Sequence, residues 1–290
     1  MGLRFTVLLL VRWPWPVRGG KRTLRKNQMA APILLPDNAD TLQAGWVVAV
    51  DKPLHWTSFD VVNKLKYAFR RAYGLKNLKI GHAGTLDPLA TGVLVVCAGR
   101  ATKEIETHMA GEKAYRAILR LGYTTASYDA ETALVPFENA FFPLNASDWE
   151  TWLPGFRGTI QQRPPVFSAL KMGGKTLYHL ARKGETVDIP ARPVHISSLE
   201  VISYDAENGL LELDIVCGKG TYIRSLAHDL GQAAGCGAYL YGLQRTRVGD
   251  RSLDRSVSLP DLLEALKIRE AGLSSGDAGA ETPEAPRSAE

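Results

Sequence analysis

Cysteine is scarce in this sequence of 290 residues, which holds three in all. Cys97, Cys217 and Cys236 are an odd number, and no two of them have the C-x-x-C spacing of a redox or metal motif. Disulfide-dependent proteins carry even sets of cysteines at close spacing, so a disulfide framework is disfavoured. Because free thiols are typical of a reducing compartment, we expect the protein in the cytoplasm.

Clusters of metal-binding residues are also lacking. The six histidines are scattered, with no H-E-x-x-H motif and no histidine paired with a cysteine at ligand spacing. This distribution predicts that the protein has no metal site. The run Gly174-Lys175-Thr176 resembles the end of a Walker A loop, but the first glycine of that motif would fall at Ala169, so we reject a phosphate-binding loop of this type.

No apolar run is long enough to cross a membrane, and we expect no membrane partner. The longest candidate near the N-terminus, Phe5–Val11, is followed by Trp13-Pro14-Trp15-Pro16 and basic residues, where a signal peptide would show a small-residue cleavage site. We expect residues 1–44 to lie outside the fold, as a disordered extension or because Met29 is the true start.

Charge is unevenly distributed along the chain, whose formal net charge is +5. Residues 1–44 hold seven basic and two acidic residues, and residues 272–290 hold one basic and four acidic, which leaves a net charge of about +3 on the middle. A mildly basic body suits an anionic partner such as RNA, although many soluble proteins have a similar charge. The segment 271–290, rich in Ala, Ser, Gly, Pro and Glu, is expected to be a disordered tail.

A strand over Gly45–Val50 and a helix after it open the folded body, which we place at 45–270. Thr57 and Asp60 have capping-box spacing, and apolar residues recur at helical period as far as Ala72. The opposite surface carries Lys64, Lys66, Arg70 and Arg71. These charges indicate either a solvated face or one that meets phosphates.

Alternating apolar residues predict strands along most of the remaining body. The predicted strands are 115–121, 199–204, 210–217 and 238–248, and Glu207-Asn208-Gly209 predicts a hairpin between the second and third. The predicted helices are 101–109, 148–153, one that starts near Thr221 with Tyr222 and Arg224 in its first turn, and one capped by Ser258. Sequential strands joined by a hairpin predict an α+β fold with a largely antiparallel mixed sheet flanked by helices and loops.

The stretch from Gly81 to Gly92, which leads into the apolar run Val93–Val96, is the most distinctive in the chain. It places Asp87 inside a loop punctuated by glycines, and Pro88 fixes its own φ angle and biases Asp87 away from helix. Such a loop can hold one carboxylate at the mouth of a cleft, or it can be a surface turn with a solvated aspartate. A second stretch, 161–190, is basic and predicts a mobile arm.

Several ordered motifs between about 45 and 268 are similar to those of the TruB family of tRNA pseudouridine synthases. They are Val50-Asp51-Lys52-Pro53, Gly81-His82-Ala83-Gly84-Thr85-Leu86-Asp87-Pro88, Lys113-Ala114-Tyr115-Arg116, Pro164-Pro165-Val166-Phe167-Ser168-Ala169-Leu170-Lys171, Ala191-Arg192-Pro193-Val194, Gly218-Lys219-Gly220-Thr221-Tyr222-Ile223-Arg224 and Leu243-Gln244-Arg245-Thr246. Any one of them alone would be a weak signal, whereas their common order is a strong one.

The resemblance implies the pseudouridine synthase catalytic fold, with the basic stretch 161–190 as a thumb-like insertion that closes on RNA. It implies isomerisation of uridine to pseudouridine at position 55 in the T arm of tRNA, without a metal or organic cofactor. The partner would be tRNA, with no obligate protein partner; the sequence does not fix the oligomeric state, and a monomer is the simplest expectation.

The resemblance also implies roles for individual residues. Asp87 matches the catalytic aspartate, which could attack the ribose C1′ or the base C6, or assist proton abstraction at C2′. Tyr115 matches a tyrosine that stacks on the flipped base and moves the C5 proton, and Arg224 matches an arginine that pairs with the aspartate. His82 matches a histidine that fills the space left by the base, and Tyr222 and Leu243 match pocket-lining positions. Taken singly, Tyr115 and Leu243 would be core residues, and His82 and Arg224 ordinary surface side chains.

Two departures from the family pattern affect these expectations. Family members often carry Thr-Asp-Thr after the Tyr115 strand, but here Ala126 stands at the acidic position and Asp129 follows, which puts the role of that acid in doubt. Many members end in an RNA-binding PUA domain, which we do not expect after residue 268. Two other functions stay open: a non-catalytic RNA-binding or tRNA-folding module on the same scaffold, and a synthase for another RNA.

Overall fold

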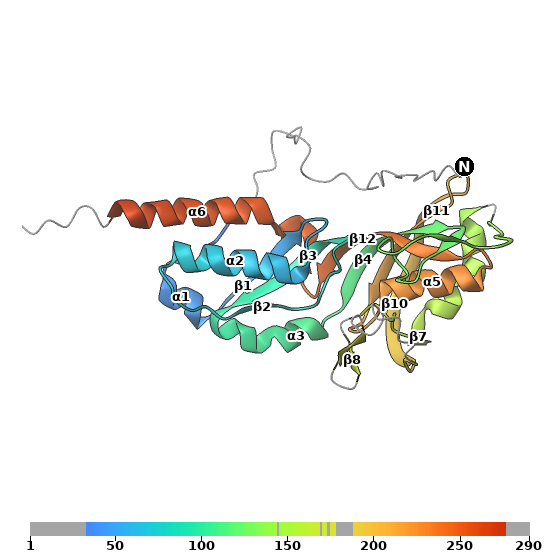
Figure 1. Cartoon of the computed structure of the whole chain (residues 1–290), viewed down its shortest axis with the longest axis horizontal. Helices are drawn as coiled ribbons and strands as arrows, with labels where there is room; N and C mark the ends of the chain where they lie inside the picture. The colour runs from blue at the N-terminus through green and yellow to red at the C-terminus, as the bar shows by residue number, and fades with distance from the viewer. Residues whose placement is uncertain (1–32, 144, 169, 173–174, 178–187, 277–290) are drawn as a thin grey trace, which may run out of the picture. The chain divides into compact units, whose positions relative to one another are not determined.

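In the computed structural model, residues 33–276 are described, apart from 144, 169, 173–174 and 178–187. Within these residues, ten strands form one sheet in the order β14-β1-β3-β12-β4-β11-β10-β7, with β13 added to β12 and β2 added to β3 (Figure 1). Two pairs are parallel, β1 with β14 and β3 with β12, and the other pairs are antiparallel. The predicted α+β class with a largely antiparallel mixed sheet is confirmed.

The strands of the main sheet are β1 Trp46–Lys52, β2 Ile80–His82, β3 Ala90–Ala98, β4 Lys113–Leu121, β7 Gly158–Gln162, β10 Arg192–Asp205, β11 Leu210–Cys217, β12 Ala238–Val248, β13 Arg251–Ser252 and β14 Val257–Ser258. Among the described residues, two short strand pairs lie outside it, β5 Tyr123–Thr124 with β6 Val135–Pro136, and β8 Lys171–Met172 with β9 Lys175–Thr176. The helices are α1 Ala39–Ala44, α2 Ser58–Ala72, α3 Ile105–Ala110, α5 Ile223–Ala233 and α6 Leu259–Gly276. The 3₁₀ turns are η1 Gly99–Glu104, η2 Ala146–Thr151, η3 Leu153–Phe156 and η4 Leu253–Arg255.

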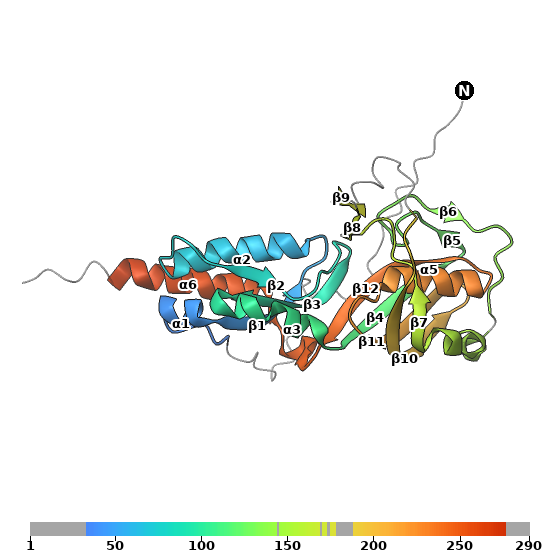
Figure 2. The ribbon, with the colours of Figure 1, turned by 90° about the horizontal axis from the view of Figure 1, so that it is seen from below.

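Helices α2 and α6 lie along one part of the sheet and α5 along another (Figure 2), and a hydrophobic cluster fills the interior at each place. In the first, Leu65 and Phe69 of α2 and Leu262 of α6 pack on Leu94 of β3. In the second, the buried residues of α5 pack with those of β4, β11 and β12, together with Trp149 of η2. The parallel pair β3–β12 joins the two parts, so residues at its ends lie between both clusters.

Strand β3 explains the uninterrupted apolar run that precedes Gly99. Leu94 and Val96 lie in the cluster under α2, whereas Val93 and Val95 lie in a third cluster with Val248 of β12. Because the side chains of a strand alternate between the two faces of a sheet, a strand buried on both faces reads as a continuous hydrophobic run.

Helix α2 starts where its sequence predicts. The Thr57 backbone N–H and hydroxyl donate to the Asp60 carboxylate at 2.9 and 2.6 Å, and the Asp60 N–H donates to Thr57 Oγ1 at 3.0 Å, which completes the capping box. The last helix begins after Ser258, whose hydroxyl accepts a hydrogen bond from the Asp261 N–H at 3.2 Å, as predicted. Among the helices described, none combines the length and the apolar composition that a bilayer span requires.

The N-terminal boundary of the fold lies earlier than residue 45, which corrects the prediction for residues 33–44. Leu42 of α1 is fully buried in the cluster under α2, and Tyr73 donates its hydroxyl proton to the Pro36 carbonyl at 2.7 Å. These contacts are long-range, so the weak local pattern of the segment did not show them. The other part of the predicted extension, residues 1–32, lies outside the described residues.

Three further boundaries differ from the sequence-based ones. Helix α6 continues to Gly276, past the expected end of the body at 270, and residues 277–290 lie outside the described residues. Gln161 and Gln162 belong to β7 of the main sheet, because they pair with Pro193 and Arg192, so the insertion begins after them. Part of that insertion, residues 169, 173–174 and 178–187, is not described. The helix predicted at 148–153 falls on two 3₁₀ turns, η2 and the start of η3.

Replacing Leu42 tests whether α1 belongs to the folded unit. Leu42→Ala should lower the free energy of unfolding by about 2–5 kcal/mol, because it removes buried methyl groups and leaves a cavity. The measurement is urea-induced unfolding. Leu34→Ala is the control, since that side chain is 79% exposed and its loss should change stability by less than about 0.5 kcal/mol. If the two variants have the same free energy of unfolding, α1 is not part of the folded unit and the N-terminal boundary of the fold lies at residue 45.

Candidate active site

The loop that carries Asp87 runs from β2 to β3, and a buried arginine of β12 holds it in place. Arg245 of β12 is 1% exposed, and its Nε donates to the Val93 carbonyl at 2.7 Å. Its two terminal nitrogens donate to the carbonyls of Gly84 and Thr85 at 3.0 and 3.4 Å. One guanidinium therefore holds both ends of the loop against the strand pair β3–β12.

Gly92 allows the close approach that brings Arg245 to this position. Its φ is +99°, and a Cβ there would lie 2.2 Å from the Arg245 carbonyl oxygen. Any other residue would push β12 away from β3, so the glycine after the loop is required by packing.

A second set of hydrogen bonds fixes the loop from the side of α2. Ser58 donates its hydroxyl proton to the Leu86 carbonyl at 3.0 Å and accepts from the Leu86 N–H at 2.8 Å. The His55 N–H donates to the Pro88 carbonyl at 2.8 Å. Asp87 thus lies between two anchored neighbours, and its backbone is held on both sides.

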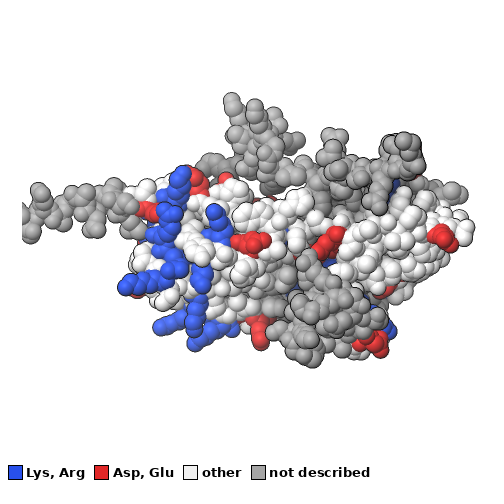
Figure 3. All heavy atoms as spheres, in the orientation of Figure 1, with Lys and Arg blue, Asp and Glu red and all other residues white. Residues whose placement is uncertain are grey.

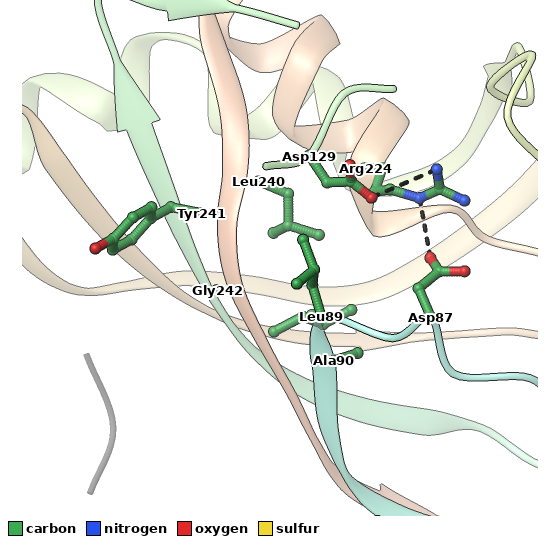
Figure 4. A pocket seen from close by; sticks show the side chains of 9 residues that line it. Asp87, Leu89, Ala90, Asp129, Arg224, Leu240, Tyr241 and Gly242 are labelled. Atoms are coloured by element: carbon green, nitrogen blue, oxygen red, sulfur yellow. Dashed lines mark ion pairs between the residues drawn. The ribbon is translucent and has the colours of Figure 1, made fainter. Parts of the chain in front are cut away.

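Arg224, at the start of α5, lies between two carboxylates (Figure 4). Its Nε is 3.0 Å from Asp87 Oδ2, and its Nη1 is 3.6 Å from Asp129 Oδ2. The Arg224 and Asp129 side chains are each 6% exposed, whereas that of Asp87 is 40% exposed. Of the three charged groups, Asp87 is therefore the one that a bound molecule can reach.

Burial raises the pKa of Asp87 above its ordinary value, and the Asp129 charge raises it further. Arg224 opposes this shift most strongly, and Lys52 and Arg245 add smaller opposing contributions. Ionisation of the Asp87 carboxyl near neutral pH thus depends on the cations around it.

Asp129 is the residue that sequence reasoning placed in doubt. Its Oδ1 accepts from the Ser127 hydroxyl at 2.6 Å and from the Glu131 N–H at 2.9 Å, which directs the other oxygen toward Arg224. Although Ala126 stands where family members often carry an acid, Arg224 still has a second carboxylate beside it, that of Asp129. The only sequence signal was an acid close to the expected position, and nothing local showed that it meets α5.

Tyr115 lies on β4 directly opposite Arg245 on β12, and the Arg245 charge acts on its phenol. The tyrosine is 8% exposed, and burial raises the pKa of its phenol, so the hydroxyl keeps its proton at neutral pH. Arg245 had no predicted role, although its motif was recognised. The structure connects it to both the Asp87 loop and Tyr115.

His82 and Lys52 lie in the same charged neighbourhood. Burial, and then the Arg245 charge, lower the pKa of His82, whose buried Nδ1 makes no hydrogen bond within the described part of the chain. Lys52 is fully buried, and burial lowers its pKa to about 8, with the Asp87 charge opposing the shift. Its Nζ donates to the carbonyls of Pro53 and Trp56 at 3.0 and 2.5 Å.

The two predicted pocket residues have different surroundings. Leu243 lines a pocket with Asp87 and Arg224, and it pairs with Ala90 and Ala117 in the sheet. The other lining residues are Leu89, Ala90, Asp129, Leu240, Tyr241 and Gly242 (Figure 4). Tyr222 is the residue just before α5, and its ring lies 5.2 Å from the Arg192 guanidinium. Within the described residues, no hydrogen bond joins Tyr222 to Asp87 or Tyr115.

Comparison with known proteins places these residues in a family. Residues 70–223 match the TruB family pseudouridylate synthase (N terminal domain), and residues 224–276 match the tRNA pseudouridylate synthase B C-terminal domain. The chain is 48% identical to tRNA pseudouridine synthase B of Parabacteroides distasonis, over 78% of this chain and 97% of that protein. It is 47% identical to tRNA pseudouridine synthase B of Phocaeicola vulgatus, over 78% of this chain and 96% of that protein.

Two solved complexes contain chains with the same fold. A Cbf5-Nop10-Gar1 complex matches with a TM-score of 0.57 at 28% identity, over 77% of this chain and 54% of that chain. An H/ACA RNP bound to a substrate RNA containing 2′-deoxyuridine matches with a TM-score of 0.56 at 26% identity, over 83% of this chain and 57% of that chain. The chain thus spans a little more than half the length of these structural relatives. The family matches, which together cover residues 70–276, and the close similarity to two bacterial proteins over almost their whole length show that the chain belongs to the TruB family of pseudouridylate synthases.

Proposed function

We propose that the protein isomerises uridine to pseudouridine at position 55 in the T arm of tRNA, with Asp87 as the catalytic carboxylate. The observation that carries this proposal is the Asp87–Arg224 ion pair at 3.0 Å, in which the arginine is buried and the aspartate is partly exposed. A carboxylate kept charged by a buried guanidinium, at the edge of a pocket, is suited to react with a ribose or a pyrimidine.

The reaction breaks the bond between N1 of the base and C1′ of the ribose and forms a bond between C5 and C1′. The proton lost from C5 is balanced by the proton gained at N1, so substrate and product are isomers and no oxidant or reductant is needed. Asp87 acts at C1′, at C6 or on the C2′ proton, and all three routes require an ionised carboxylate within reach of the nucleotide.

A uridine must leave the RNA stack to reach Asp87, at a cost of a few kcal/mol. The pocket offers apolar walls at Leu89, Leu240 and Leu243 that can cover the extruded base. In this proposal Tyr115 provides a ring for the base, His82 fills the space that the base leaves, Tyr222 contributes to the base pocket, and Arg245 is a positioning residue for the Asp87 loop and for Tyr115.

Tyr115→Phe separates the ring from the hydroxyl. If the phenol moves the C5 proton, this variant should bind tRNA normally and form pseudouridine about 10²- to 10⁴-fold more slowly, as expected for a lost general acid or base. The measurement is the single-turnover rate beside the Kd for tRNA. Tyr115→Leu is the comparison, because it removes the ring as well and should weaken binding. A Phe variant with the wild-type rate would leave Tyr115 only a stacking role.

The direct test of the proposed function is release of tritium from tRNA transcripts that carry [5-³H]uridine. The protein should release tritium from a transcript with uridine at position 55 and none above background when that position is cytidine. Mapping of pseudouridine in tRNA from cells that lack this chain should show loss at the same position. RNA binding without tritium release would favour the non-catalytic RNA module.

We also propose that residues 33–276 are one catalytic domain that works in the cytoplasm. The support for the domain is the burial of Leu42 in the cluster under α2. The support for the compartment is that Cys97, Cys217 and Cys236 are all buried free thiols, which a reducing environment preserves.

A further inference from the structure

The segment from α2 to β2 holds a concentration of positive charge. Residues 58–79 contain six Lys or Arg and one acid, a net charge of +5 that equals the value for the whole chain. Its exposed cations are Lys64, Arg71, Lys76 and Lys79, and the neighbouring turn η1 exposes Arg100 and Lys103. Figure 3 shows Lys and Arg side chains gathered in a band over the end of the domain where α2 lies in Figure 1.

A groove opens on the first half of α2, before the basic band. It is lined by His55, Trp56, Asp60, Asn63, Lys64 and Tyr67. Tyr67 is 58% exposed, and Phe59 beside the groove is 70% exposed, so large aromatic side chains face solvent on a basic surface. Aromatic rings beside lysines are the usual means of binding unpaired nucleotides, because every base has a face that can stack.

The groove is attached to the Asp87 loop by hydrogen bonds. His55, which lines the groove, donates its N–H to Pro88, the residue after Asp87, and Ser58 of α2 bonds both ways with Leu86. The backbone at His55 has φ +66°, an uncommon value for a residue with a side chain, and the bond to Pro88 holds it there. The groove therefore has a fixed position beside the catalytic carboxylate.

We propose that this surface, the groove together with the basic residues that follow it, is a second binding surface for the substrate RNA. The inference rests on the proposed function and extends it. The groove takes an unpaired base next to the reacting uridine, with Tyr67 or Trp56 against the base. The lysines and arginines farther along bind phosphates of the adjoining stem, and α2, at about 22 Å long, can follow a stem over several base pairs.

Two of the charged groups on this surface are engaged elsewhere. Asp60 accepts hydrogen bonds from Thr57 as the helix cap, and Arg71 lies 2.6 Å from Glu270 of α6. Lys64, at the groove, and Lys79, before β2, are exposed and are the cations best suited to a test.

The first experiment measures the Kd for tRNA against salt concentration by filter binding. The double variant Lys64→Gln/Lys79→Gln should flatten the slope of log K against log salt by about 1 per lysine and weaken binding on the order of ten-fold at 0.1 M salt. The matched control is Arg255→Gln/Lys267→Gln, which removes two exposed charges from η4 and α6. If the lysine variant and the control variant have the same slope, the basic residues of this surface do not bind phosphates and this part of the proposal is wrong.

The second experiment tests the groove with a T-arm hairpin. Tyr67→Ala should weaken binding roughly 5- to 100-fold, as expected when one stacked base loses its ring. Phe59→Ala, which removes an aromatic that is outside the groove and even more exposed, should leave the Kd unchanged. The Tyr67→Ala effect should vanish on a hairpin that is abasic at one neighbour of the target uridine; an effect of the same size on both abasic hairpins would contradict the groove assignment.

Tritium release by the wild-type protein separates the two proposals. If the wild type releases tritium and the α2 variants bind tRNA like the controls, the proposal that this surface binds RNA is wrong and the proposed function stands. If the α2 variants lose affinity as expected but the wild type releases no tritium, the surface stands and the proposed function is wrong.

Discussion

Asp87→Asn is expected to lower pseudouridine formation by about 10⁴-fold or more while tRNA binding persists. The substitution keeps the size of the side chain and an oxygen that can accept from Arg224, but it removes the negative charge that each route of the reaction needs. Loss of a group that bonds to substrate or takes its proton has effects of this size in other enzymes. The measurements are single-turnover tritium release and the Kd for tRNA.

Asp129→Asn is the matched control for this variant. It removes a charge from the same arginine, but the Asp129 side chain is 6% exposed, whereas that of Asp87 is 40% exposed. We expect a smaller loss of rate, because this residue acts through Arg224. Tritium release by Asp87→Asn at the wild-type rate would remove Asp87 from the mechanism.

Arg224→Gln is expected to reduce the rate at pH 7 by about 10²- to 10³-fold, the usual cost of removing a charged or hydrogen-bonding group that holds a reacting residue. The physical reason is the pKa of Asp87. Burial and Asp129 raise that pKa, and Arg224 is the largest opposing influence. Without the guanidinium the pKa of Asp87 rises further, so less of the carboxyl is ionised at neutral pH.

This explanation makes a specific prediction about pH. The acidic limb of the rate profile of Arg224→Gln should move to higher pH, so that raising the pH recovers part of the lost rate. Arg224→Lys keeps the positive charge but cannot face both carboxylates as the guanidinium does. It should therefore shift the acidic limb of the rate profile by less. A profile that falls uniformly at every pH would show that Arg224 does not act through ionisation of Asp87.

The same substitution should also affect folding. Asp129 is buried, and Arg224→Gln leaves its carboxylate without the cation beside it. Removing one partner of a buried ion pair costs about 3–5 kcal/mol of stability. Urea unfolding of Arg224→Gln and of Asp87→Asn should therefore differ, with the arginine variant less stable.

The sequence by itself determined the local elements and singled out the carboxylate that we propose as the reacting group. The capping box of Thr57 and Asp60 placed the start of α2, and Asn208-Gly209 placed the turn between β10 and β11. These features depend on residues a few positions apart, whose steric and hydrogen-bonding preferences act within one segment. The ordered family motifs marked Asp87, Tyr115 and Arg224, and the structure puts Asp87 and Arg224 in contact.

Only the tertiary structure decided which charges surround Asp87 and where the fold begins. Asp129 reaches Arg224, and Arg245 reaches both Tyr115 and the Asp87 loop, because β12 pairs with β3 on one side and with β4 on the other. Leu42 becomes a core residue only when α1 packs beside β1 and η1 and Leu42 joins the buried cluster that contains residues of α2. These contacts join segments far apart in the chain, so the hydrophobic pattern of a single segment does not predict them. The low dielectric of the packed interior then sets how strongly each charge acts on Asp87.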